Sequence, residues 1–154
     1  MDEDVLIVLD AWRGGADATE TLGYLEEDAV RELAGALHVE DAVVRVRALQ
    51  ALARTRNSYA LDAIMPFYRD PSPQVRLAAL QAACDQGGDA DPLSLQTFGE
   101  LILSDPEPEV RRRAASTLGL IHSIRARTGL EKVLQDPTLS ADLRALVEAQ
   151  LSHF

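Results

Sequence analysis

Among the residues of this chain, the arginines have the type and the spacing that most clearly suggest a chemical role. Arg111, Arg112 and Arg113 are consecutive, and the stretch from Val110 to Leu130 holds five Arg and no acidic residue. A guanidinium presents several N–H donors in a planar fork that matches carboxylate and phosphate oxygens. The cluster therefore predicts a site for an anion or for an acidic partner.

A second set of arginines recurs at a constant position, which predicts a structural role. The chain repeats an apolar residue followed by Arg at Val44-Arg45, Val75-Arg76, Val110-Arg111 and Leu143-Arg144. An Arg one position after a buried residue lies about 100° round the helix, at the edge of the buried face. From there it can reach a turn Asp of a neighbouring unit, such as Asp70 or Asp105. We therefore expect a ladder of hydrogen bonds between units, which leaves Arg112 and Arg113 for another role.

Histidine and cysteine are too sparse for metal or nucleophilic chemistry. The three His, at positions 38, 122 and 153, are far apart in the sequence, and none has another His three or four residues away. Cys84 is the single Cys, so the chain offers no paired thiol for a metal or an intramolecular disulfide. We expect no metal and no cofactor, and we interpret Cys84 as a structural thiol.

Catalytic sequence motifs are missing as well. The chain contains no G-x-S-x-G, no G-x-G-x-x-G and no phosphate-binding loop, so nothing marks a nucleophile or a phosphate site. Asp85, Asp89 and Asp91 flank Gly87-Gly88 as in a calcium loop, but no Glu closes the segment and its spacing differs. We interpret this segment as a turn, and we expect a protein without catalytic residues.

These side chains are positioned by a sequence that repeats. The stretch DPSPQVRLAALQAA from Asp70 to Ala83 returns as DPEPEVRRRAASTLG from Asp105 to Gly119. Its apolar anchors, Val44, Val75, Val110 and Leu143, are 31, 35 and 33 residues apart. That spacing is enough for two helices and two turns. Apolar or small residues at offsets 0, +4, +7 and +8 from each anchor form one helical stripe, which predicts the buried face of the second helix in each hairpin.

The Asp-Pro pair before each stripe predicts a tight turn. Asp accepts hydrogen bonds from nearby backbone N–H groups, and Pro disfavours helix in the residue that precedes it. One helix must therefore end at this pair, and another can begin after it.

The pattern D-P-x-x-x-V-R-x-x-A-A-x-x-L-G resembles the HEAT repeat, in particular the short variety of the phycobilisome-lyase-like HEAT proteins. The resemblance covers residues 29–151 and is closest in the repeats that begin at Asp70 and Asp105. It implies an all-α fold, a right-handed α-solenoid of the armadillo/HEAT type with about four to five helical hairpins. It also implies two alternatives for function, a bilin-lyase-like protein or a chaperone subunit, so lyase-type activity stays open.

We expect one HEAT-like domain over residues 1–154, with N-terminal capping helices in residues 1–26 and four hairpin repeats in residues 27–154. Trp12 belongs to the cap, which lacks the repeat signature. The predicted helices are 3–13 and 18–25, then the pairs 28–38 with 42–55, 59–68 with 73–85, 92–103 with 108–122, and 124–134 with 141–152. Phe154 either closes the last hairpin or meets another molecule, and we favour the first.

Charge is divided unevenly along the chain. Residues 1–41 hold 12 acidic and 2 basic residues, whereas residues 42–154 hold 13 of each, so the net charge of −10 lies in the first quarter. Phosphate contacts dominate the affinity of proteins for nucleic acid. An acidic chain with a single Lys therefore argues against a nucleic-acid partner, which we keep as the weaker alternative.

The chain shows no sign of a membrane segment. Its longest apolar run, residues 5–9, is too short to span a bilayer and follows acidic residues where a signal peptide carries basic ones. We expect a cytoplasmic protein without membrane contact, and we slightly favour a monomer.

The surface predicted to bind a partner follows from the phase of the repeat. Offsets +2, +6 and +9 from each anchor point away from the buried stripe, toward the inner, concave wall of such a superhelix. The +9 positions are Ala53, Cys84, Gly119 and Ser152. The candidate protein-binding residues are Val46, Arg47, Gln50, Leu77, Gln81, Arg112, Arg113 and Ser116. We expect a non-catalytic scaffold or adaptor that binds another protein or a peptide there; an ordinary solvated face is the alternative.

Overall fold

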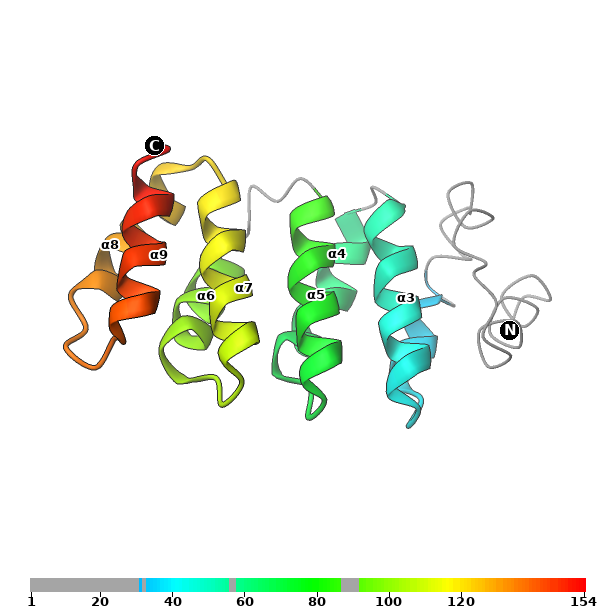
Figure 1. Ribbon diagram of the computed structural model, residues 1–154. Helices are drawn as coiled ribbons and strands as arrows, with labels where there is room; N and C mark the ends of the chain where they lie inside the picture. The colour runs from blue at the N-terminus through cyan, green and yellow to red at the C-terminus, as the bar shows by residue number, and fades with distance from the viewer. Residues whose placement is uncertain (1–30, 32, 56–57, 87–91) are drawn as a thin grey trace. The chain divides into compact units, whose positions relative to one another are not determined.

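The computed structural model describes residues 31, 33–55, 58–86 and 92–154. The predicted capping helices, Trp12, most of the acidic first quarter and the start of the helix predicted over 28–38 lie outside these residues. All regular elements in the described part are helices (Figure 1). They are the 3₁₀ helix η2 (Ala36–His38), α3 (Ala42–Arg54), α4 (Ser58–Ile64), the 3₁₀ helix η3 (Met65–Arg69), α5 (Pro73–Asp85), α6 (Pro92–Ser104), α7 (Pro108–Leu120), α8 (Ile124–Leu134) and α9 (Ala141–Leu151).

The predicted helices from residue 42 onward are confirmed, with two informative differences. The helix predicted over 59–68 changes to 3₁₀ geometry at Met65, because Pro66 has no N–H to donate to the preceding turn. The helix predicted to end at His122 ends at Leu120, and Ile121 adopts an extended conformation with φ −84° and ψ 90°.

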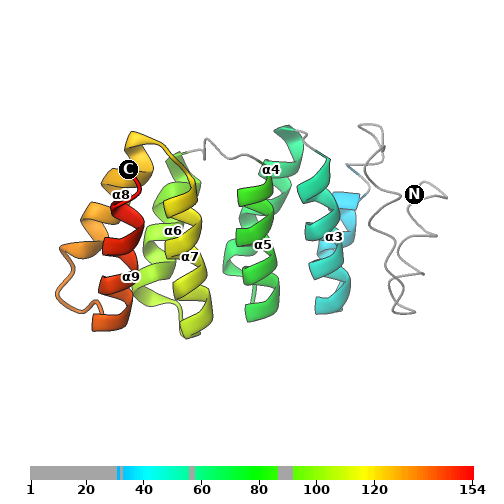
Figure 2. The ribbon, with the colours of Figure 1, turned by 45° about the horizontal axis from the view of Figure 1, so that its top comes forward.

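The contacts divide the chain into two compact units, residues 1–86 and 87–154, and each is described by itself. That they form one domain stays a prediction. In the first unit α3 and α5 lie side by side, and η3 and α4 pack against α5 (Figures 1 and 2). In the second unit α7 packs beside α9 in one layer, and α6 packs beside α8 in the other. Each unit is therefore a stack of helical hairpins in two layers.

The predicted buried stripe is the core of both units. The four anchors Val44, Val75, Val110 and Leu143 are all buried, and so are the residues four positions later, Ala48, Ala79, Ala114 and Val147. Three of these four +4 residues are Ala, whose small side chain lets neighbouring helices approach closely. Larger side chains come from the other layer, where Tyr68 and Phe98 are fully buried.

Each Asp-Pro turn is closed by the side chain of its Asp. The Oδ1 atoms of three aspartates accept backbone N–H groups two residues later: Asp70 from Ser72 at 2.8 Å, Asp105 from Glu107 at 2.9 Å, and Asp136 from Thr138 at 2.8 Å. This is the Asx-turn. The second Pro of the motif is the first residue of α5 and of α7, where its missing N–H costs nothing. The expectation of a tight turn capped by Asp is confirmed.

The ladder between repeats is confirmed for Arg45. Its Nε donates to Oδ2 of Asp70 at 3.0 Å and its Nη2 to Oδ1 at 3.1 Å, a two-point contact between successive hairpins. Its Nη1 also donates to the carbonyl oxygens of Val39 at 2.9 Å and Glu40 at 2.7 Å. Arg45 therefore joins its own turn to the next one.

The other arginines of this set donate to carbonyl oxygens of the turn in their own hairpin. These hydrogen bonds run from Arg76 to Asp70 at 2.8 Å, from Arg111 to Asp105 at 2.6 Å, and from Arg144 to Leu134 at 2.8 Å and Asp136 at 3.1 Å. A role in bracing the turn therefore recurs in every copy, in addition to the role between copies that the spacing predicts.

The last hairpin is closed at its end by an aromatic contact. Phe154 packs edge-on against His122, with the ring centroids 5.6 Å apart. The preferred prediction, that Phe154 closes the hairpin, agrees with this contact inside the second unit.

The turn at Asp136 predicts a local dependence of stability on pH. Hydrogen bonds from the Thr138 hydroxyl and backbone N–H, and secondarily the charge of Arg144, hold the pKa of Asp136 below its ordinary value of 3.8. A carboxyl whose pKa is lower in the folded state stabilises the fold above its unfolded-state pKa, and this contribution is lost as pH falls through the folded-state pKa. We expect the stability of Asp136→Asn to fall less steeply than that of the wild type as the pH falls below about 4, because the variant has no carboxyl to protonate at this turn.

Urea denaturation followed by circular dichroism at several pH values measures this difference. Asp62→Asn, which removes an exposed carboxyl of α4, is the matched control. Equal slopes for Asp136→Asn and Asp62→Asn would contradict the prediction.

Candidate protein-binding groove

An open groove of about 310 Å³ runs between α3 and α5 in the first unit. It is lined by Arg47, Gln50, Ala53, Arg54, Ala78, Gln81, Ala82 and Asp85. Three of the eight predicted binding residues, Arg47, Gln50 and Gln81, therefore meet at one place, although they come from two different repeats.

The spacing of residues on the two helices explains why they face each other. Along α3, Arg47, Gln50 and Arg54 follow the spacing i, i+3, i+7, which places them on one face. On α5 the same spacing holds for Ala78, Gln81 and Asp85. The groove is floored by Ala53 and Ala82, which are 4% and 1% exposed. Small residues below and long polar residues above make a shallow polar groove.

Helix α3 is held at its start by a side-chain cap. Oδ1 of Asp41 accepts the backbone N–H of Val43 at 2.8 Å. At the other end, the side chain of Gln86 donates to the carbonyl oxygens of Leu52 at 2.7 Å and Ala53 at 3.1 Å, which joins the ends of α3 and α5. The two walls of the groove are thus tied together at the C-terminal ends of their helices.

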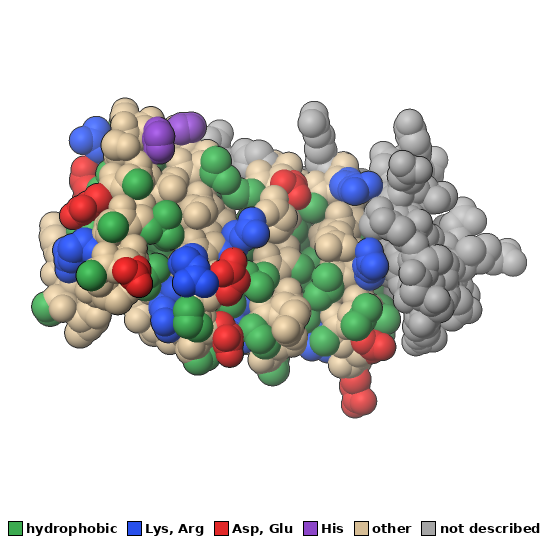
Figure 3. Space-filling model, in the orientation of Figure 1, with side chains coloured by type: hydrophobic (Ala, Val, Ile, Leu, Met, Phe, Trp, Pro, Cys, Tyr) green, Lys and Arg blue, Asp and Glu red, His purple; other side chains and the backbone are tan. Residues whose placement is uncertain are grey.

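The charges at the groove are unequal. Asp85 accepts a hydrogen bond from Nε2 of Gln81 at 2.9 Å. Within the described ranges, no carboxylate lies within ion-pair distance of Arg47 or Arg54, whereas Arg45 on the same helix is engaged by Asp70. Figure 3 shows basic side chains along α3 on this face. With two guanidinium groups and one carboxylate, the charged side chains that line the groove carry a net positive charge.

The remaining predicted binding residues lie elsewhere. Val46 and Leu77 are half-buried and do not line the groove. Ser116 is half-buried on α7 in the second unit, where Arg112 and Arg113 are exposed. Arg112 is partly balanced, because its Nη2 donates to Oε2 of Glu109 at 2.8 Å. Contact of Arg112, Arg113 and Ser116 with a partner stays a prediction.

The prediction of an open face at offset +9 is wrong for two of its four positions. Ala53 and Gly119 are buried, whereas Cys84 is half-buried and Ser152 is exposed. Gly119 is covered by Gln150 of α9, so closely that a Cβ at Gly119 would lie 2.6 Å from Cδ of Gln150. A helical wheel gives the direction of a side chain from its own helix, and it does not include the neighbouring helix that covers it.

Two charged residues of the groove, Arg54 and Asp85, are absent from the predicted binding residues. Arg54 lies seven residues after Arg47, and Asp85 lies four residues after Gln81. Their signal was present as helical spacing from residues already chosen. Because candidates were chosen by offset from the anchors, the charged residue at the end of each helix was left out.

Nothing in the described residues points to catalysis. No three His, Cys, Asp or Glu side chains there are grouped so that they could hold a metal ion. Cys84 is half-buried at the end of α5. Across the described part of the chain, no helix combines the length and the apolar character needed to cross a membrane.

A family model described as HEAT repeats matches the chain three times, over residues 16–82, 30–97 and 68–152. The chain belongs to the HEAT-repeat family. The fold class predicted from the sequence, an all-α solenoid, is confirmed by these matches together with the helical hairpins. The narrower likeness to the phycobilisome-lyase-like variety is not shown by this match and stays a prediction. None of the curated proteins matches the chain significantly.

A candidate protein-binding groove between α3 and α5 is consistent with membership in the HEAT family. HEAT repeats are commonly protein-interaction scaffolds, and the family is typically non-catalytic. The matches overlap along residues 16–152, so both described units of this HEAT protein are built from the same kind of repeat.

Proposed function

We propose that this HEAT protein is a non-catalytic scaffold or adaptor, and that its α3–α5 groove binds an acidic segment of a partner protein. The observation that supports this most strongly is the pair Arg47 and Arg54. Both line the groove, and within the described ranges neither is engaged by a carboxylate of the chain. A guanidinium that lines a groove and has no internal ion pair can bind a carboxylate from outside.

The spacing of the two arginines suggests how the segment is bound. Seven residues along a helix correspond to about 10.5 Å. A peptide in the extended polyproline II conformation rises about 3.1 Å per residue with three residues per turn, so carboxylates three residues apart lie on one side, about 9.3 Å apart, which is close to this distance. Gln50, which lies between the two arginines on α3, offers an amide donor and acceptor to the peptide backbone. The small floor residues let that backbone approach closely.

Charge reversal at the groove tests the proposal. We expect Arg47→Glu with Arg54→Glu to reduce co-purification of at least one partner tenfold or more, which corresponds to about 1.4 kcal/mol. Proteins that co-purify with the tagged wild type and variant are compared by quantitative mass spectrometry. The captured partner's acidic segment, made as a peptide, should then bind the wild type with an affinity that falls as salt is raised.

Arg127→Glu is the matched control, because Arg127 is an exposed Arg of α8 outside the groove. Circular dichroism checks that each variant keeps its helices. If every co-purifying protein is retained equally by Arg47→Glu/Arg54→Glu and by the control, the groove is not the binding site. Cytoplasmic location and a monomeric state stay predictions.

A further inference from the structure

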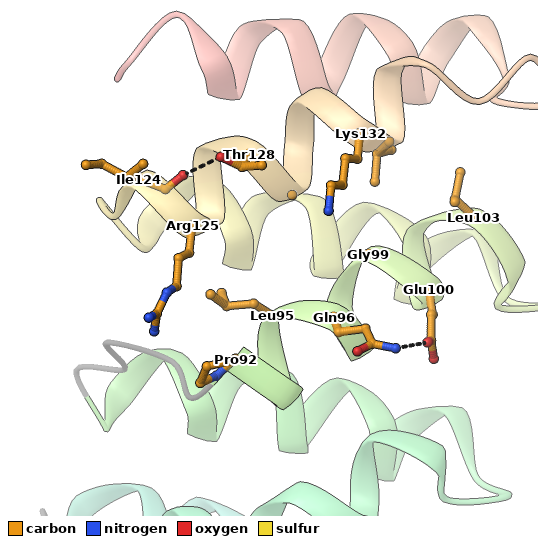
Figure 4. Close-up of a pocket in the computed structure, with 12 residues that line it drawn as sticks. Pro92, Leu95, Gln96, Gly99, Glu100, Leu103, Ile124, Arg125, Thr128 and Lys132 are labelled. Carbon is orange, nitrogen blue, oxygen red and sulfur yellow. Dashed lines mark hydrogen bonds between the residues drawn. The ribbon is translucent and has the colours of Figure 1, made fainter.

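A second groove lies in the second unit, between α6 and α8 (Figure 4). Its volume is about 560 Å³, and none of the residues predicted to bind a partner lines it. It belongs to the layer made by the first helices of the hairpins, whereas the binding residues predicted from the sequence all lie on the second helices. Its character differs from that of the α3–α5 groove, because its lining is mainly apolar.

Two of the residues that line this groove are glycines. Gly99 of α6 and Gly129 of α8 both line it. A Cβ at Gly99 would meet only Val133, at 3.9 Å, and one at Gly129 would meet only Leu118, at 4.0 Å, and both are ordinary contact distances. Helix packing therefore does not require Gly at either position, although Gly inside a helix costs about 1 kcal/mol relative to Ala. Because neither glycine has a side chain, the space between α6 and α8 stays open at these two positions.

Apolar side chains stand exposed at both ends of the groove. Ile124 is 85% exposed and Leu103 is 38% exposed, and Figure 4 shows them at opposite ends. Leu95 and Val133 form buried parts of the lining between them. A continuous apolar lining with exposed ends is typical of a surface that another molecule covers.

The rim of the groove is positively charged. Arg125 and Lys132 extend from α8 toward α6 (Figure 4), and among the residues that the structure places, neither forms an ion pair. Arg127 and Glu131 on the same helix pair with each other at 3.0 Å, so they do not offset this charge. Across the groove, Glu100 accepts a hydrogen bond from Nε2 of Gln96 at 3.0 Å.

We propose that the α6–α8 groove binds an amphipathic helix of a partner protein, with an apolar face and two acidic residues seven positions apart. The acidic residues match Arg125 and Lys132, which are themselves seven residues apart, about 10.5 Å along α8. The apolar face covers Ile124 and Leu103, the exposed apolar side chains at the two ends of the groove.

A helix fits this groove better than an extended segment does. An extended segment needs partners for its backbone N–H and C=O groups, and an apolar lining offers few of them. A helix satisfies those groups internally and presents side chains at i, i+3, i+4 and i+7 to a groove. Helix α6 borders the groove from Pro92 to Leu103, about 16 Å, which is the length of about 11 helical residues.

The test uses two stapled, fluorescein-labelled peptides of about 14 residues, because unconstrained helices of this length are marginal in water. Both carry Leu at i, i+3, i+4 and i+7. One has Glu at two flanking positions seven residues apart, and the other has Lys at the same positions. Fluorescence anisotropy with the full chain at low salt should show at least tenfold tighter binding of the Glu peptide.

Variants of the chain locate the site. Gly129→Leu fills the groove and should weaken binding of the Glu peptide at least tenfold. Arg125→Glu with Lys132→Glu should make the Lys peptide bind more tightly than the Glu peptide. If Gly129→Leu does not fold, this double variant tests the proposal by itself. Arg127→Glu, on the same helix but outside the groove, should change affinity less than twofold. Arg47→Glu with Arg54→Glu should have no effect, which separates this proposal from the function proposed for the α3–α5 groove.

Several results would overturn the proposal. One is equal affinity for the two peptides, and another is no binding of either. Displacement of the Glu peptide by dodecanoate, with saturable dodecanoate binding that Gly129→Leu abolishes, would identify a fatty-acid site instead. Dimers in light scattering that Gly129→Leu dissociates would show that a second copy of this chain occupies the groove.

Discussion

Replacing Asp70 by alanine is expected to lower the free energy of unfolding of the first unit by about 3–5 kcal/mol. Asp70 is 8% exposed, and its two carboxylate oxygens bind Nε and Nη2 of Arg45. The side chain of Arg45 is only 13% exposed, so removal of Asp70 leaves a largely buried charge without its ion pair. The substitution also removes the hydrogen bond that closes the turn at Ser72.

Urea denaturation measures the loss, and hydrogen exchange with mass spectrometry shows whether protection falls in α3 and α5. Asp70→Asn separates the two causes, because Asn keeps an oxygen for the N–H of Ser72 and loses the charge. Glu131→Ala is the matched control: it removes an exposed ion pair with Arg127, for which we expect about 0.5 kcal/mol or less. A cost for Asp70→Ala no larger than that of Glu131→Ala would contradict the expected role of the ladder.

Phe98→Ala is expected to lower the free energy of unfolding of the second unit by about 3–5 kcal/mol. Phe98 of α6 is 0% exposed and is among the largest fully buried side chains. Its helix packs against both α7 and α8, and truncation of a fully buried ring leaves a cavity beside α6. The cavity lacks the dispersion contacts of the ring, and the helices around it can only partly close it.

Leu93→Ala on the same helix is the control, because Leu93 is 57% exposed and its truncation should cost about 0.5 kcal/mol or less. Both variants are compared by urea denaturation, and hydrogen exchange should place the lost protection of Phe98→Ala in α6, α7 and α8. Similar midpoints for Phe98→Ala and Leu93→Ala would show that this core is not packed as the structure has it.

The helix bounds were largely predictable because they depend on local chemistry. The segment Pro73–Asp85 begins after an Asx-turn and runs through one apolar stripe, and both features can be read from the sequence. The bounds failed where local signals are weak. Nothing in the residues around Leu120 predicts that Ile121 leaves the helix. In the helix predicted over 59–68, Pro66 does signal an interruption, but the predicted bounds did not take it into account.

The candidate site was partly predictable for the same reason. Gln50 and Gln81 were chosen by their offset from the anchors, and they do face each other across the groove. Offset +9 failed at Ala53, which is buried at the bottom of the groove, and at Gly119, because Gln150 of α9 covers it. Such a contact depends on the distance between two helices, which a single helical wheel does not contain.

By itself, the sequence determined the repeat, the helices, the turns that separate them, the buried stripe and the HEAT family, because periodicity and turn chemistry act between residues close in the chain. Only the tertiary structure decided where grooves lie. Gly99 and Gly129 are 30 residues apart, and the sequence of neither helix indicates a site at its glycine. They become neighbours in one apolar groove because α6 packs beside α8, and the width of that space is set by side chains from both helices.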